Sequence, residues 1–183
     1  FSSPVKLSSN NLLAIEGMEK SEIQKLIERA DYFANLDRHT NTKVLQGYVV
    51  LNVFFENSTR TRVSFELAAR RLGAEVINIS LINSSIKKGE SLLDTASTLN
   101  AMRPDLLIVR HPHSGAPLLF ADYLNCSIIN AGDGRHEHPT QALLDALTIK
   151  RSVGYLEGLK ISICGDIANS RAVSYTHLTL PTR

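Results

Sequence analysis

Cysteine is scarce in this 183-residue sequence. Cys126 and Cys164 are the only two, they are far apart, and each lies in an apolar stretch. Isolated cysteines of this kind are usually buried as small apolar side chains. Without a CxxC pair or a dense set of thiols, the sequence predicts neither a disulfide framework nor a zinc site.

Long apolar runs and a strong net charge are missing too. No run approaches the ~20 residues that cross a bilayer, and the first residues, "FSSPVKLSSNN", lack both a Met and the apolar core of a signal peptide. Lys and Arg total 20 against 18 Asp and Glu, a formal charge of +2. That excess is too small to indicate binding to nucleic acid or to a membrane surface. We therefore expect a cytoplasmic protein without nucleic-acid or membrane partners, whose true start lies upstream.

The remaining composition is that of a protein with a core, since 43% of the residues are hydrophobic and 21% are charged. Short β-rich runs alternate with helical patterns along the chain. The β-rich runs cover 48–55, 75–80, 105–110, 127–132 and 160–165. The helical patterns cover 18–37, 58–73, 91–102, 115–124 and 138–151. The first four runs are bounded by turn residues and predict strands buried on both faces.

Several helix ends carry their own signals. Ser91 and Asp94 have the spacing of a capping box, and Gly73 is a plausible C-terminal stop. Pro139 stands near the first turn of the last helix, and Lys150 and Arg151 stand at its end, in agreement with the helix dipole.

This alternation predicts an α/β fold: a parallel sheet with helices on both faces, followed by the first strand of a second α/β domain. We expect a first domain over 1–139, an interdomain helix over 140–152 and the start of the second domain over 153–173. The fifth strand could instead extend the first sheet. The segment 174–183, "SYTHLTLPTR", lacks helical periodicity, which suggests a foreign or frame-shifted tail; a genuine extended C-terminus is the alternative.

Polar and cationic residues follow four consecutive predicted strands. They are Ser58, Thr59, Arg60, Thr61 and Arg62 after the first strand, Ser84, Ser85, Lys87 and Lys88 after the second, Arg110 at the end of the third, and His136, His138 and Gln141 after the fourth. Ligands of open parallel sheets bind outside the carboxyl ends of the strands. The four sets are therefore expected around one crevice.

The segment "STRTR" at 58–62 is typical of an anion site. The first turn of a helix has unpaired N–H groups and a partial positive charge, and the hydroxyl and guanidinium groups add donors for a phosphate or phosphate ester. A simple Ser N-cap with solvated arginines is the alternative. No GxxxxGK[ST] or GxGxxG motif is present, so nucleoside triphosphates and dinucleotides are poor candidates.

His138 and Gln141 suit a carbonyl and an amide group. A neutral His138 at a helix start can donate to a carbonyl, although it could also be a structural cap, and Gln141 lies on the same first turn. "HEH" at 136–138 near Asp133 could suggest metal ligands, but the oxygen-rich set or zinc spacing that a metal needs is not visible. No metal or cofactor is expected. The sequence offers no nucleophile triad or carboxylate pair, so charge stabilisation is the expected chemistry.

Four long motifs, in order, resemble the aspartate carbamoyltransferase family. They are "FFENSTRTRVSFELAARRLGA", "SSIKKGESLLDTASTL", "VRHPHSGAP" and "NAGDGRHEHPTQALLDALTI". "NNLLAIEGM" near the start and "GDIANSRAV" near the end are similar to the same family, so the resemblance covers about 10–173. Ornithine carbamoyltransferases share an STRTR-like turn but usually have HPCQ where this chain has HPTQ.

The resemblance implies transfer of a carbamoyl group from carbamoyl phosphate to the α-amine of L-aspartate, giving N-carbamoyl-L-aspartate and phosphate in pyrimidine biosynthesis. By position, Ser58, Thr59, Arg60 and Thr61 match the phosphate-binding turn, Arg110 the arginine on phosphate and carbonyl oxygen, His138 the carbonyl-polarising histidine, and Gln141 the ligand of the carbamoyl NH₂. Ser84 and Lys88 match a loop that enters a neighbouring subunit's site, where the lysine also meets aspartate, and Arg171 matches an aspartate-carboxylate ligand.

The shared site implies a homotrimer, and some family members also bind regulatory chains or a dihydroorotase. The family's second domain and returning C-terminal helix are missing here, so we expect weak carbamoyl phosphate binding and little or no turnover by this chain alone. Three alternatives remain: an ornithine-type carbamoyltransferase, a non-catalytic homologue acting as an assembly partner, and a phosphate-binding module without chemistry.

Overall fold

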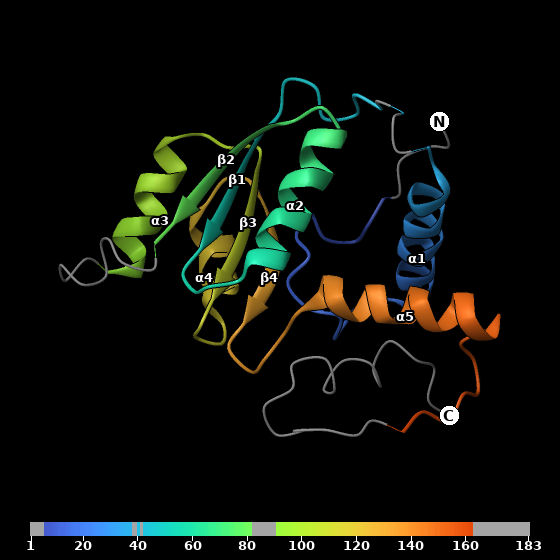
Figure 1. The fold of residues 1–183 in the computed structure, drawn as a ribbon. Helices are drawn as coiled ribbons and strands as arrows, with labels where there is room; N and C mark the ends of the chain where they lie inside the picture. The colour runs from blue at the N-terminus through green and yellow to red at the C-terminus, as the bar shows by residue number, and fades with distance from the viewer. Residues whose placement is uncertain (1–5, 38–39, 41, 82–90, 163–183) are drawn as a thin grey trace.

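The computed structural model describes residues 6–37, 40, 42–81 and 91–162. Within them, helices and strands alternate along the chain (Figure 1). The strands are β1 (Val49–Phe54), β2 (Glu75–Ser80), β3 (Leu106–His111) and β4 (Ser127–Asp133). The helices are α1 (Lys20–Asn35), α2 (Thr59–Arg71), α3 (Leu92–Ala101), α4 (Ala116–Tyr123) and α5 (Pro139–Val153). The ends of all nine differ from the predicted ranges by at most two residues.

The four strands form one parallel sheet in the order β2-β1-β3-β4. Phe54 at the end of β1 lies opposite Ser80 of β2 on one side and opposite Arg110 of β3 on the other. His111 of β3 pairs with Asp133 of β4. The predicted α/β fold with a parallel sheet is confirmed, and the strand ends that carry the polar residues share one edge.

Helices cover both faces of the sheet, as predicted, because the strand residues alternate in direction. On one face Leu51 and Val53 of β1 belong to a buried cluster that includes Leu99 of α3 and Phe120 of α4. On the other face Val50 and Phe54 of β1 pack with Ala69 of α2 and Ile108 of β3. Burial of these side chains is the main source of stability for the layered arrangement.

One strand prediction needs correction, and another lies partly outside the described residues. β2 is not buried on both faces: it stands at the edge of the described sheet with one neighbouring strand, and Ile77 at its centre is 51% exposed. The fifth predicted strand, 160–165, has no strand over 160–162, and 163–165 lie outside the described residues. An apolar β-rich run in the sequence therefore does not show whether the strand has a partner strand on each side.

The helix-end signals behave as their chemistry predicts. α2 ends in a Schellman motif, in which Ala74 N–H donates to the Ala69 carbonyl and Gly73 N–H to the Arg70 carbonyl, with Gly73 at φ +89°. Ser91 and Asp94 form the predicted capping box at the start of α3. Pro139 is the first residue of α5.

The N-terminal segment lies beside β4, at the end of the strand order opposite β2. Leu12 N–H donates to the Ile128 carbonyl, and Asn130 N–H donates to the Leu12 carbonyl, so this segment runs beside β4. Ile15, which follows it, is buried with Ile23 of α1 and Ala146 of α5 in a third apolar cluster. None of the helices in the described ranges is long and apolar enough to span a membrane.

Candidate anion-binding site

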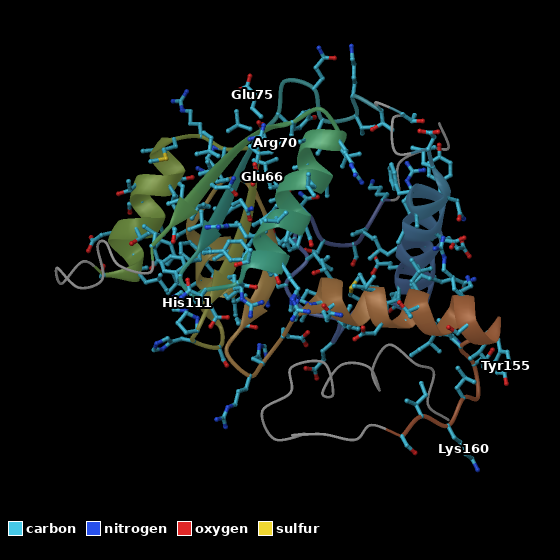
Figure 2. All side chains as sticks on the ribbon, viewed as in Figure 1. Glu66, Arg70, Glu75, His111, Tyr155 and Lys160 are labelled. Atoms are coloured by element: carbon cyan, nitrogen blue, oxygen red, sulfur yellow. The ribbon has the colours of Figure 1, made fainter. Side chains whose placement is uncertain are left out.

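The candidate site lies at the carboxyl edge of the sheet, where the chain changes direction. β1 leads through α2 to β2 on one side, whereas β3 leads through α4 to β4 on the other, and the two helices cover opposite faces. The ends of β1 and β3 therefore form a topological switch point, the usual ligand position in open α/β sheets. Figure 1 shows the arrowheads of the strands and the first turns of α2 and α5 at the same lower edge. In Figure 2, His111 lies toward this edge and Glu75 toward the opposite one.

Ser58 precedes α2 at this switch point without capping it. Ser58 occupies the N-cap position with φ −158° and ψ 87°, and its side chain makes no cap hydrogen bond. Thr59, Arg60 and Thr61 form the first helical turn, and the Arg60 side chain is exposed. The first N–H groups of a helix lack intrahelical acceptors, and no acidic residue occupies this turn. The arrangement therefore favours an incoming anion over the simple Ser cap.

Arg110 lies on the other side of the switch point and is held firmly. Its Nε donates to Glu56 Oε1 at 2.7 Å and its Nη1 donates to the Ala131 carbonyl at 3.0 Å. Only 12% of the Arg110 side chain is exposed. These two contacts fix the plane of the guanidinium, a group that binds phosphate and carboxylate oxygens in a defined direction.

His138 begins α5 in a way that parallels Ser58. It occupies the N-cap position with φ −149° and ψ 71°, its side chain makes no cap hydrogen bond, and it is 8% exposed. The structural-cap explanation for His138 is therefore not supported. Its Nδ1 lies 3.4 Å from Thr140 Oγ1. When the hydroxyl donates in this contact, the neutral ring carries its proton on Nε2.

Gln141, in the first turn of α5, forms a side-chain hydrogen bond to another residue of the same helix. Gln141 Nε2 donates to Asp145 Oδ1 at 2.9 Å, and the Gln141 side chain is partly exposed. The amide oxygen can accept from an NH₂ group while the nitrogen keeps this bond.

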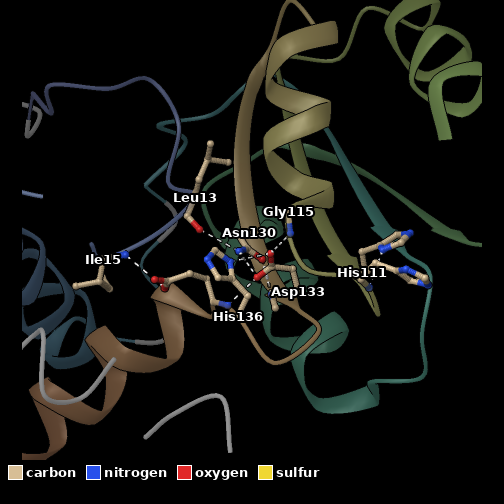
Figure 3. Close-up of polar contacts among 10 residues, drawn as sticks. Leu13, Ile15, His111, Gly115, Asn130, Asp133 and His136 are labelled. Atoms are coloured by element: carbon tan, nitrogen blue, oxygen red, sulfur yellow. Dashed lines mark hydrogen bonds and ion pairs between the residues drawn. The ribbon is translucent and has the colours of Figure 1, made fainter. Parts of the chain in front are cut away.

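A buried polar network supports the loop before His138 (Figure 3). Asp133 accepts hydrogen bonds from Asn130 Nδ2 at 3.0 Å and from the N–H groups of Gly115 and Glu137, both at 2.7 Å. Its Oδ2 also lies 3.1 Å from His136 Nδ1. The sequence raised metal binding by "HEH" and Asp133 only as an alternative that it did not favour, and the described residues contain no group of three His, Cys, Asp or Glu side chains that could hold a metal ion.

Two titratable groups near this edge have shifted pKa values. Burial raises the pKa of Glu137 to about 7, against the opposing effect of the Ile15 N–H, which donates to Glu137 Oε2 at 3.4 Å. Burial also lowers the pKa of His111, whose Nδ1 accepts from the His113 N–H at 2.9 Å. The His111 ring packs against Phe55 with centroids 4.7 Å apart. Both groups are therefore biased toward their neutral forms.

Three predicted site residues, Ser84, Lys88 and Arg171, lie outside the described residues. Conversely, Glu56 and Asp133 were not predicted as functional partners. The sequence places Glu56 two residues after β1, but only the pairing of Phe54 with Arg110 reveals that it lies beside the arginine. Cys126, expected to be buried, is partly buried against the cluster on the α3 and α4 face, and burial raises the pKa of its thiol.

An uncapped helix start and a fixed arginine at the switch point of an α/β domain are features typical of phosphate-binding domains. Residues 10–151 match the carbamoyl-P binding domain of the aspartate/ornithine carbamoyltransferases. The chain belongs to this family.

Relatives agree with that assignment. The chain is 59% identical over 171 residues to the aspartate carbamoyltransferase catalytic subunit of Rhodospirillum rubrum, covering 92% of this chain and 54% of the relative. It is 56% identical over 175 residues to that of Jannaschia sp., covering 94% and 56%. The chain therefore spans little more than half the length of these curated relatives.

Solved structures agree as well. Aspartate transcarbamoylase from Trypanosoma cruzi in complex with carbamoyl phosphate and aspartate superposes with a TM-score of 0.88 at 37% identity, covering 97% of this chain and 56% of that one. The catalytic subunit of M. jannaschii aspartate transcarbamoylase gives 0.85 at 41% identity, covering 93% and 56%.

Proposed function

We propose that this chain forms the carbamoyl-phosphate-binding part of an aspartate carbamoyltransferase. The complete protein would transfer the carbamoyl group of carbamoyl phosphate to the α-amino group of L-aspartate, giving N-carbamoyl-L-aspartate and phosphate. One observation carries the proposal: the uncapped start of α2 follows β1 and the fixed guanidinium of Arg110 ends β3, so the two lie on either side of the β1–β3 switch point. The curated relatives and the ligands named for the T. cruzi structure support the same substrates.

The proposed mechanism is electrostatic. Ser58, Thr59, Arg60 and Thr61 would bind the phosphate through hydroxyl, backbone and guanidinium donors. Arg110 and the Nε2–H of His138 would stabilise the negative charge that develops on the carbonyl oxygen as the amine attacks. The bond between the carbonyl carbon and the phosphate oxygen would then break, and the departing phosphate, its charge balanced by the helix start, would take the proton that the attacking amine loses, so no nucleophilic side chain is required.

Calorimetric titration of the chain with carbamoyl phosphate tests the site, with Arg60→Ala as the variant. Saturable binding that is lost in a folded Arg60→Ala chain is expected. Arg29→Ala on α1 is a suitable control, because it removes the same group from a helix that lies away from the carboxyl edge. Equal binding by Arg60→Ala and the wild type would contradict the proposal.

Gln141→Ala separates a carbamoyl phosphate site from a plain phosphate site. If Gln141 holds the carbamoyl NH₂, the variant should bind carbamoyl phosphate more weakly and inorganic phosphate as well as before. Equal losses for both ligands, or none, would favour a phosphate-binding module without chemistry.

The larger assembly is part of the proposal. Lys88 and Ser84 would enter the site of a neighbouring subunit and Arg171 would bind the aspartate carboxylate, with 140–152 linking to a second domain that starts within 153–173. A site shared between subunits requires an oligomer, and we propose a homotrimer in the cytoplasm, to which regulatory chains or a dihydroorotase could bind. Sedimentation equilibrium of the complete protein should give a trimer, and a monomer with full activity would contradict the shared site.

A further inference from the structure

The carboxylate of Asp133 connects the loops that follow β3 and β4. Its Oδ2 accepts from the Gly115 N–H at the start of α4, and its Oδ1 accepts from the Glu137 N–H directly before His138, both at 2.7 Å. Asp133 is 1% exposed. Hydrogen bonds to a buried charged acceptor are short and directional, so this side chain holds both loops at defined distances.

The Asp133 backbone adds a second restraint on His138. The Asp133 N–H donates to the Glu137 carbonyl at 3.0 Å. That carbonyl belongs to the same planar peptide as the His138 nitrogen, so the bond fixes the orientation in which the chain enters α5. Figure 3 shows Asp133 between Gly115 and the loop that carries His136.

Close backbone contact between the two loops leaves little room for adjustment. Gly134 N–H donates to the His111 carbonyl at 3.0 Å. A Cβ atom at Gly134 would lie 2.8 Å from both the Pro112 carbonyl oxygen and Ser114 Oγ. The loops therefore contact each other through backbone, and the carboxylate sets how they fit together.

The same segment carries the restraint on Arg110. Arg110 Nη1 donates to the carbonyl of Ala131, two residues before Asp133. The segment 131–137 therefore connects the two residues: Arg110 is hydrogen-bonded to Ala131 at its start, and His138 directly follows Glu137 at its end. We propose that Asp133 is a positioning residue that holds the His138 imidazole in register with the Arg110 guanidinium. This inference rests on the proposed function, in which those two groups share one carbonyl oxygen.

Asp133→Asn is the variant that tests the inference. Each carboxylate oxygen faces a backbone N–H, so either orientation of the asparagine amide places an N–H against an N–H. Asp105→Asn is the matched control. Asp105 Oδ2 accepts from the Val49 N–H at 2.7 Å, the same type of bond at the opposite edge of the sheet.

Three quantities are measured on the 183-residue chain: the melting temperature, the Kd for carbamoyl phosphate, and the imidazole Cε1–Hε1 NMR signal of His138, assigned by its loss in His138→Gln. Asp133→Asn should weaken binding about tenfold or more, because misplacement of a positioned group is costly. It should also shift the His138 signal. Asp105→Asn should leave Kd and the His138 signal unchanged even if it lowers the melting temperature.

An unshifted His138 signal in a folded Asp133→Asn chain would overturn the inference, whatever happens to Kd. If the wild-type chain binds no carbamoyl phosphate, the proposed function of this chain fails, and the His138 signal alone decides: a shift confined to Asp133→Asn supports positioning, and no shift overturns it.

Gly134→Ala keeps the inference testable if Asp133→Asn does not fold. The added methyl group should separate the two loops without removing the carboxylate, since its place is occupied by the Pro112 carbonyl oxygen and by the backbone nitrogen and Oγ of Ser114. It should shift the His138 signal and weaken binding in the same direction. Unchanged values in a folded Gly134→Ala chain would overturn the inference.

Discussion

Glu137 is an acidic residue whose side chain is buried, where a negative charge is energetically unfavourable. It is 1% exposed, and its Oε2 accepts one long hydrogen bond from the Ile15 N–H. Burial raises its pKa to about 7 from the ordinary 4.5. Between pH 4.5 and 7 the folded chain therefore holds a proton that the unfolded chain has released.

The free energy of unfolding should depend on pH through this group. Because the pKa is higher in the folded state, Glu137 contributes stability that is complete below pH 4.5 and is lost as the pH rises through 7. Glu137→Gln removes the effect. The wild type minus variant difference should fall by roughly 3 kcal/mol between pH 4 and pH 8. Urea unfolding at several pH values measures it.

Glu75→Gln is the control for this experiment, since Glu75 is exposed at the amino end of β2, whereas Glu137 follows the carboxyl end of β4. Groups that titrate equally in the wild type and in a variant cancel in each difference. The same pH slope for Glu75→Gln as for Glu137→Gln would contradict the assignment to Glu137.

The residues of the candidate anion-binding site and the residues that hydrogen-bond to its segments differ in how far the sequence could predict them. Ser58 to Thr61, Arg110 and His138 were recognised because they follow strands, and a strand end can be read from one segment. Glu56 accepts a hydrogen bond from Arg110 and Asp133 accepts one from the Gly115 N–H, and the two members of each pair are distant in sequence. Such pairs depend on strand order and register, which local patterns do not specify.

At the scale of the element, two glycines follow helices with nearly the same positive φ but in different surroundings. Gly73 after α2 has φ +89° and Gly154 after α5 has φ +91°. A Cβ at Gly73 would lie 3.1 Å from Lys43 Cα, whereas a Cβ at Gly154 would have no neighbour within 4 Å. The pair separates backbone strain from steric contact.

Gly154→Ala should lower the free energy of unfolding by about 1 kcal/mol, the cost of a left-handed L-residue. Gly73→Ala should cost more, because the segment 43–46 must also shift. Equilibrium urea unfolding of both variants measures the difference. Equal losses would mean that the contact with Lys43 is relieved at no cost.

The elements themselves were largely predictable, because their signals are local. The periodicity of α2 and its Gly73 stop both lie within the segment that folds. The exposure of β2 was not predictable, because its Val and Ile residues resemble those of a central strand. An edge position depends on which strands pair, and this is decided by the whole sheet.

At the scale of the whole molecule, ligand binding should be visible as stability. A ligand that binds only the folded chain adds about 2.7 kcal/mol at a concentration 100 times its Kd. For a chain of this size that corresponds to a rise in melting temperature of roughly 5–10 °C. Carbamoyl phosphate should produce this rise in the wild type.

Arg110→Ala should abolish most of the rise, and Arg151→Ala is the control, because Arg151 pairs with Asp31 on the exposed side of α1 and α5. Differential scanning calorimetry of the three proteins checks the prediction. An equal rise in Arg110→Ala would mean that the ligand binds elsewhere.

The segment around Leu12 has a consequence for how copies of the chain behave toward one another. This segment pairs with β4 and so occupies backbone groups on the outer side of that strand, which would otherwise be an exposed edge strand. Among the described strands, that leaves β2 as the exposed edge strand. Without residues 6–13, both outer strands of the described sheet would be exposed edge strands. A molecule with two exposed edge strands can pair with another molecule at each side of its sheet. We therefore expect this short segment to limit the growth of aggregates that form by strand pairing.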